Sequence, residues 1–194
     1  MIIISNPIAV ENEINIIHSL FIEGLKLLHV RKPNFSETEM KAFLSEIRME
    51  FRNRLVLHQH HHLSDEFNIE RLHFSEKNRA GSYLFPKKTI STSTHSITDF
   101  NMLDSVFEYA FLSPVFSSIS KKGYSSKLDF SIEIEKRTNH KTKLIALGGI
   151  QAENINQAIS FGFDDVALLG AIWESTNPLE NFKKCQQTDL SYSL

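Results

Sequence analysis

Two short segments decide the fold class: Leu144-Ile145-Ala146-Leu147-Gly148-Gly149-Ile150, and about twenty residues later Val166-Ala167-Leu168-Leu169-Gly170-Ala171-Ile172. Each is an aliphatic run that ends in glycine before a helical stretch, a pattern typical of a strand-to-helix turn. Glycine lets the backbone approach an anion, and the free N–H groups of a helix N-terminus point toward it. The two turns therefore predict a phosphate cup at the last two strands of a (β/α)₈ barrel. Two buried strands with no ligand remain the alternative.

The rest of the chain has the alternating pattern that this fold requires. Short apolar runs alternate with longer amphipathic segments, as in a parallel sheet wrapped by helices. The candidate strands are residues 2–5, 25–30, 55–58, 72–74, 89–93, 109–112, 144–147 and 166–169. Because no linker interrupts them, we expect one domain over residues 1–194, an α/β protein with a single (β/α)₈ (TIM) barrel.

Several local signals predict where helices begin, end or are missing. Residues 11–23 carry an apolar helical stripe, Ser36 and Glu39 have the spacing of a capping box, and Gly162 is placed to end a helix. Residues 75–88 are polar and show no such stripe. Since 194 residues is slightly short for this barrel, we expect the helix between strands 4 and 5 to be reduced or missing.

Composition narrows the class of partner. The net charge of −2 gives no reason to expect nucleic acid or an acidic membrane surface, so a small molecule is the expected partner. A lone cysteine, Cys185, excludes a disulfide framework and fits a reducing compartment. No apolar run is long enough for a membrane span or a signal peptide, which favours a cytoplasmic protein.

Reactive groups in a parallel barrel stand where the strands end. His29 and Arg31 alternate with Val30, so they share one face of the second strand and could reach the pocket together. The segment 113–124 is rich in serine and carries Lys121, as expected of a loop that closes over a phosphorylated ligand. An arginine paired with a neighbouring carboxylate and a solvated linker are the alternatives.

The third strand ends in a run of histidines. His58 and His60 are two residues apart and share a face, and neutral imidazoles suit a transition metal. A hydrogen-bonded or solvated histidine turn is the other interpretation, and His73 after the fourth strand reads as a packing histidine.

Five motifs in order resemble the thiamine-phosphate synthase and thiazole tautomerase (TenI) family of (β/α)₈ barrels. They are His29-Val30-Arg31, Ser91-Thr92-Ser93-Thr94-His95, Ser113-Pro114-Val115-Phe116, Ser118-Ile119-Ser120-Lys121 and Ala146-Leu147-Gly148-Gly149-Ile150. The resemblance implies a role in thiamine biosynthesis. It implies a transferase that joins hydroxymethylpyrimidine pyrophosphate to thiazole phosphate, with pyrophosphate leaving from a carbocation-like centre. It further implies that two copies can form a homodimer.

The same resemblance implies roles for particular residues. Arg31 and Lys121 would stabilise the departing pyrophosphate. Ser93, Ser118 and Ser120 would hold phosphate or pyrimidine groups. The thiazole phosphate would lie on backbone N–H groups of the cup formed by Gly148, Gly149, Leu169 and Gly170.

The metal site departs from the family pattern. The synthase holds Mg²⁺ with two aspartates, and an ungapped alignment puts Gln59 and Asn78 at those positions. Amides are weaker ligands for this hard cation, so bound Mg²⁺ is doubtful. Glu76 and His58 are the other candidate ligands. The second lysine of the family falls on Pro33, with Lys32 one step away.

The tautomerase branch also departs at its key position, because its proton-transferring histidine falls on Pro114. His29 or His58 would have to move the proton instead. Three functions therefore stay open: a synthase with a remodelled pyrophosphate site, a thiazole tautomerase-like isomerase, and a non-catalytic barrel that binds a phosphorylated ligand.

Overall fold

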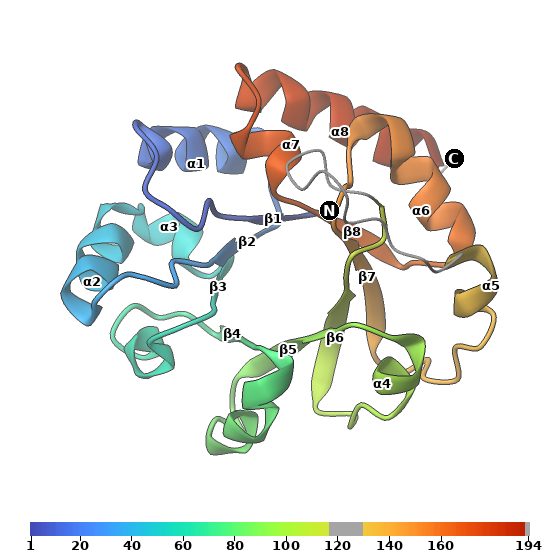
Figure 1. Cartoon of the computed structure of the whole chain (residues 1–194). Helices are drawn as coiled ribbons and strands as arrows, with labels where there is room; N and C mark the ends of the chain where they lie inside the picture. The colour runs from blue at the N-terminus through green and yellow to red at the C-terminus, as the bar shows by residue number, and fades with distance from the viewer. Residues whose placement is uncertain (117–129, 193–194) are drawn as a thin grey trace.

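Eight parallel strands close into one barrel, with each strand paired to its neighbours in chain order and β8 paired to β1. The computed structural model describes residues 1–116 and 130–192. Figure 1 shows the strands at the centre of the molecule and the helices around them. The strands are β1 Ile2–Ile4, β2 Leu27–Val30, β3 Leu55–Leu57, β4 Arg71–Phe74, β5 Thr89–Thr94, β6 Phe107–Leu112, β7 Lys143–Leu147 and β8 Asp165–Leu168.

Helices follow most of the strands and cover the outside of the barrel (Figure 1). The α-helices are α1 Glu13–Ile22, α2 Glu37–Glu46, α3 Met49–Arg52, α4 Ile97–Asn101, α5 Phe130–Ile134, α6 Ile155–Phe161, α7 Gly170–Trp173 and α8 Pro178–Tyr192. Short 3-10 segments are η1 His61–Ser64, η2 Glu76–Leu84 and η3 Ala152–Asn154.

Two apolar clusters occupy the two faces of the sheet. The larger lies between the strands and the helices, and includes the outward-facing Ile3, Leu28 and Val30. The smaller fills one side of the barrel interior with residues of β1, β6, β7 and β8: Ile2, Ile4, Tyr109, Phe111, Ile145 and Ala167. Because side chains alternate along a strand, the inward positions of β2 to β5 complete the interior. They include histidines and serines.

The predicted barrel is confirmed. All eight expected strands are present, and their first and last residues differ from the observed ones by at most two positions. The Ser36 hydroxyl oxygen accepts a hydrogen bond from the Glu39 N–H, and the Ser36 N–H donates to the Glu39 carboxylate, which completes the expected capping box. Gly162 ends α6 with φ 105°, a conformation that favours glycine.

The expected gap in the helical layer lies between β4 and β5. A 3-10 segment, η2, takes the place of an α-helix there, as the absence of a helical stripe predicted. On this side of the barrel, the Phe74 ring of β4 packs against the rings of Phe85 and His61. Within residues 1–116 and 130–192, the helices are too short or too polar to cross a bilayer.

Candidate active site

The inward face of β2 places His29 inside the barrel. Its side chain is fully buried and packs on the Phe111 ring at a centroid distance of 4.8 Å. Val30 faces the helices on the opposite side. The alternation expected from the sequence therefore holds, but His29 lies below the mouth of the barrel.

Three inward histidines from neighbouring strands meet at this level, and we call His29, His58 and His73 the histidine cluster. His29 Nδ1 lies 2.9 Å from His58 Nε2, in hydrogen-bond contact. The His58 and His73 rings stack with centroids 4.1 Å apart. Because β2, β3 and β4 are adjacent and in register, their alternating inward positions bring the rings together.

Hydroxyl groups from β5 and β6 bind the outer nitrogens of the cluster. The Tyr109 hydroxyl lies 2.7 Å from His29 Nε2. Ser91 Oγ and Ser93 Oγ each lie 2.9 Å from a different ring nitrogen of His73. Each of these two imidazoles therefore has its orientation fixed by a hydroxyl partner.

Burial keeps the histidine cluster neutral at pH 7. It lowers the pKa of His29 and of His58 well below the ordinary value, and the charge of His73 acts in the same direction. It lowers the pKa of His73 to about 3, with further contributions from His61 and Arg31. At neutral pH each ring therefore carries one N–H donor and one nitrogen lone pair that acts as an acceptor.

Arg31 stands just beyond the end of β2, beside the histidine cluster. Its charge contributes to the lowered pKa values of His58 and His73. Its backbone is fixed by Ser5, since the Arg31 N–H donates to Ser5 Oγ at 2.9 Å. The half-buried guanidinium is thus a positive charge at the mouth of the barrel.

Lys32 does not stand in for the missing family lysine. Its side chain points away from the mouth, is fully buried, and forms an ion pair with Glu13 of α1 at 2.6 Å. The Nζ also donates to the Ile8 carbonyl and lies over the Phe43 ring. Lys32 is therefore committed to the packing of the helical layer against the sheet.

The turn after β7 has the geometry that the two glycines suggest. Gly148 has φ 94° and Gly149 has φ 66°. A Cβ on Gly149 would lie 2.7 Å from the Phe116 carbonyl oxygen, closer than real contacts allow. The Phe116 N–H donates to the Gly148 carbonyl, so the segment after β6 lies directly on this turn.

The turn after β8 leads directly into a helix. Leu169 is the N-cap of α7 and Gly170 is its first residue. The first N–H groups of a helix lack partners within the helix. Because β7 and β8 are paired, the two glycine turns end at the same side of the mouth, with β1 between them and β2.

The proposed magnesium ligands do not form a carboxylate site. Gln59 Oε1 accepts a hydrogen bond from the Lys32 N–H at 3.2 Å. The Glu76 carboxylate faces His95, 3.8 Å away, and Asn78 is exposed in η2. In the described residues, the histidine cluster is the one group of three His, Cys, Asp or Glu side chains close enough to share an ion, and Glu76 is outside it.

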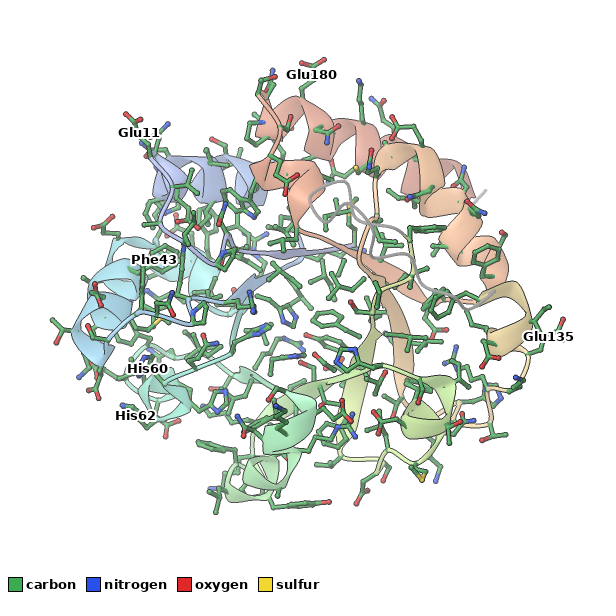
Figure 2. The ribbon with its side chains drawn as sticks, in the orientation of Figure 1. Glu11, Phe43, His60, His62, Glu135 and Glu180 are labelled. Carbon is green, nitrogen blue, oxygen red and sulfur yellow. The ribbon has the colours of Figure 1, made fainter. Side chains whose placement is uncertain are left out.

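His60 does not share a site with His58, contrary to the expectation from their spacing. His60 adopts a left-handed backbone (φ 53°), which turns its ring away so that Nε2 contacts the Phe35 carbonyl. Figure 2 shows His60 and His62 at the edge of the molecule, outside the ring of strands. The backbone conformation at His60 breaks the alternation on which the prediction depended.

The predicted site residues and the observed ones differ in two ways. Lys121, Ser118 and Ser120 lie outside the described residues. His73 belongs to the histidine cluster, and Ser91 and Tyr109 are in hydrogen-bond contact with it, but none of the three was predicted as a site residue. Each is a polar residue at an inward position of an otherwise apolar strand, and that was the signal available.

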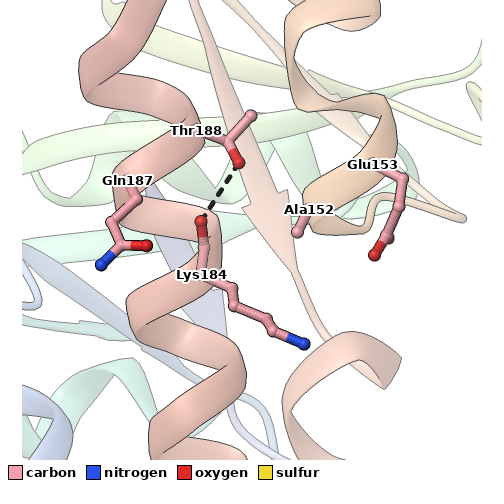
Figure 3. Close-up of a pocket in the computed structure, with 5 residues that line it drawn as sticks. All are labelled: Ala152, Glu153, Lys184, Gln187 and Thr188. Carbon is pink, nitrogen blue, oxygen red and sulfur yellow. Dashed lines mark hydrogen bonds between the residues drawn. The ribbon is translucent and has the colours of Figure 1, made fainter.

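A surface cavity of about 380 Å³ lies between α8 and η3 (Figure 3). Glu153 and Lys184 are among its lining residues, and the Thr188 hydroxyl donates a hydrogen bond to the Lys184 carbonyl. These groups offer no reactive arrangement, so the mouth of the barrel is the candidate active site.

The closed parallel sheet defines the chain as a (β/α)₈ barrel, and comparisons with known proteins give its family. A family model described as thiamine monophosphate synthase matches residues 1–172. The chain belongs to this family.

Individual relatives agree with the family match. A thiamine-phosphate synthase of Oceanobacillus iheyensis is 23% identical over 75% of this chain and 73% of its own length. One from Staphylococcus epidermidis is 23% identical over 79% and 78%. The crystal structure of a thiamine phosphate pyrophosphorylase from Bacteroides thetaiotaomicron is similar with a TM-score of 0.79 and 27% identity, covering 97% of this chain and 96% of that one.

Proposed function

We propose that this protein is a thiamine-phosphate synthase, a transferase that joins hydroxymethylpyrimidine pyrophosphate to thiazole phosphate and releases pyrophosphate. The observation that carries the proposal is the layout of the mouth. A guanidinium, Arg31, lies at one part of it, and two glycine turns that can expose backbone N–H groups lie at another.

The two parts suit the two anions of this reaction. Arg31 presents fixed positive charge where negative charge develops as pyrophosphate leaves, which lowers the barrier electrostatically. Gly149, Leu169 and Gly170 offer main-chain donors to the phosphate of the thiazole substrate. The neutral histidine cluster lies between the strands that lead to Arg31 and to Ser93, where the pyrimidine would lie.

The residues at the ends of β3 and β4 do not fit a two-carboxylate magnesium site. Gln59 and Asn78 offer amides, and the Gln59 oxygen already accepts a hydrogen bond from the backbone. We therefore assign the charge on the protein side of the leaving group to Arg31, and to Lys121 on the family pattern.

The test is product formation from the two purified substrates. We expect thiamine phosphate and pyrophosphate to appear in equal amounts, measured by chromatography and by a coupled phosphate assay. The assay is run with excess Mg²⁺ and with chelator. Tight binding of thiazole phosphate without any turnover under either condition would instead favour the ligand-binding barrel.

Replacing Arg31 with alanine separates the two parts of the mouth. A charge-assisted hydrogen bond is worth about 1.5–3 kcal/mol, so we expect Arg31→Ala to weaken pyrophosphate binding by roughly 10- to 100-fold. Thiazole phosphate binding should change by less than about 3-fold, because its proposed donors are main-chain groups in the turns that follow β7 and β8. Isothermal titration with each ligand measures both.

The control is Arg48→Ala, which removes an exposed arginine from the outer helical layer. It should leave both affinities unchanged. Equal losses of the two ligands in Arg31→Ala would contradict this division of the mouth.

A further inference from the structure

We propose that His29, His58 and His73 together bind one divalent transition-metal ion of the zinc class inside the mouth of the barrel. Each of the three side chains offers a nitrogen, and these nitrogens all lie within 4.8 Å of one another. Imidazole is a preferred ligand for zinc, copper, nickel and cobalt ions, whereas Mg²⁺ prefers oxygen. The inference concerns metal binding and does not depend on the proposed synthase reaction.

The spacing of the nitrogens is close to what a tetrahedral ion needs. Zinc–nitrogen bonds of about 2.0–2.1 Å place two ligand nitrogens roughly 3.3 Å apart. His29 Nδ1 and His58 Nε2 are already 2.9 Å apart and share a hydrogen bond that an ion would replace. The widest separation, at most 4.8 Å, requires side-chain shifts of roughly 1–2 Å to reach that spacing. The stacked His58 and His73 rings must also rotate about their side-chain bonds, so that their in-plane lone pairs converge on the ion.

The protonation state and hydrogen-bond partners of the three imidazole rings are suited to metal ligands. Neutral imidazoles have a nitrogen lone pair that can bind a metal once the hydrogen bond to that nitrogen is given up. Tyr109 contacts His29 through Nε2 and so leaves Nδ1 to face His58. Ser91 and Ser93 flank His73, and one of these hydroxyls can orient the ring while the other nitrogen turns to the ion.

The cluster is closed on one side and open on the other. His29 and His73 are buried, whereas His58 is half-buried and faces the mouth. Three protein ligands with one accessible side is the arrangement of catalytic rather than structural zinc sites, because the fourth position stays free for water or an oxygen ligand.

Arg31 is the cation that faces the open side of the cluster, and its charge acts on His58 and His73. Arg71 acts on His29 from the start of β4 and is itself paired with Glu108 at 2.9 Å. Arg31 disfavours a bare dication but favours one whose open position carries an anion. Hydroxide or a phosphate oxygen would supply the compensating charge.

The test is metal binding by the untagged, metal-stripped protein. We expect one equivalent of Zn²⁺ by calorimetry, and the visible absorption of a tetrahedral Co²⁺ complex when Co²⁺ replaces it. Phosphate should increase the Zn²⁺ affinity. If the unmodified protein binds neither ion, or if Co²⁺ gives only the spectrum of its aqueous ion, the proposal is wrong.

His58→Gln is the informative variant because this side chain is not fully buried and its loss should leave the barrel folded. We expect it to lower the Zn²⁺ affinity by at least about 10-fold and to abolish the Co²⁺ spectrum. The matched control is His62→Gln, an exposed histidine on η1 that pairs with Glu37. Loss of binding in His62→Gln but not in His58→Gln would assign the metal to the surface histidines and overturn the proposal.

Discussion

Replacing Glu13 with alanine is expected to lower the free energy of unfolding by about 3–5 kcal/mol. Glu13 and Lys32 are 5% and 0% exposed, and their charged groups are 2.6 Å apart. Removing the carboxylate leaves a buried ammonium whose remaining partners are the Ile8 carbonyl and the rings of Phe35 and Phe43. Urea unfolding at pH 7 measures the change.

The loss should depend on pH in a defined direction. Burial already lowers the pKa of Lys32, with Glu13 opposing that shift, so the pKa falls further when Glu13 is absent. Above the folded pKa and below the ordinary value of about 10.4 the unfolded chain binds more protons. The stability of the variant therefore rises with pH in that window, and its deficit shrinks.

Two comparisons identify the cause. Glu13→Leu combined with Lys32→Met removes both charges and should recover most of the stability, because apolar replacement of a buried pair is often neutral. Glu37→Ala removes an exposed partner of Lys41 and should cost less than about 1 kcal/mol. A deficit below about 1 kcal/mol in Glu13→Ala would contradict the buried-pair interpretation.

Replacing Gly149 with alanine is expected to damage both folding and phosphate binding. The left-handed backbone costs roughly 1–2 kcal/mol for a residue with a side chain, and the new methyl group would also meet the backbone of Phe116 at 2.7–2.8 Å. The turn must then move away from β6. We expect a loss of stability larger than the backbone cost alone, and at least a roughly 10-fold weaker affinity for thiazole phosphate, about 1.4 kcal/mol.

Gly24→Ala is the matched control. Gly24 also has a positive φ, 97°, but the nearest atom to an added Cβ is Gln186 Nε2 at 3.5 Å. It should show the backbone cost without the clash and without any effect on phosphate. Unchanged thiazole phosphate affinity in Gly149→Ala would show that this turn does not form the cup.

The barrel was predictable because each sequence signal on which the prediction depends involves only a few adjacent residues. The Ser36 capping box, the glycine at 162 and the eight apolar runs all concern contacts between near neighbours in sequence. The missing helix between β4 and β5 was predictable for the same reason, since a segment without an apolar stripe cannot cover a sheet.

The candidate site was less predictable because it depends on register between strands. Alternation placed His29 correctly, but nothing local shows that β2, β3 and β4 bring His29, His58 and His73 to one level. The left-handed backbone at His60 and the burial of Lys32 against α1 also depend on tertiary packing. Sequence spacing alone therefore favoured the wrong partner for His58.

The division of the barrel interior into an apolar side and a histidine side has a consequence for how such a protein can change over evolutionary time. The apolar side comes from β1, β6, β7 and β8, and the histidines and serines come from β2 to β5. The two sides meet where Tyr109 and Phe111 contact His29, and substitutions of residues in contact are coupled. A lineage that exchanges the histidines must therefore change the β6 residues that touch them as well, and new chemistry at this site arises by paired rather than single substitutions.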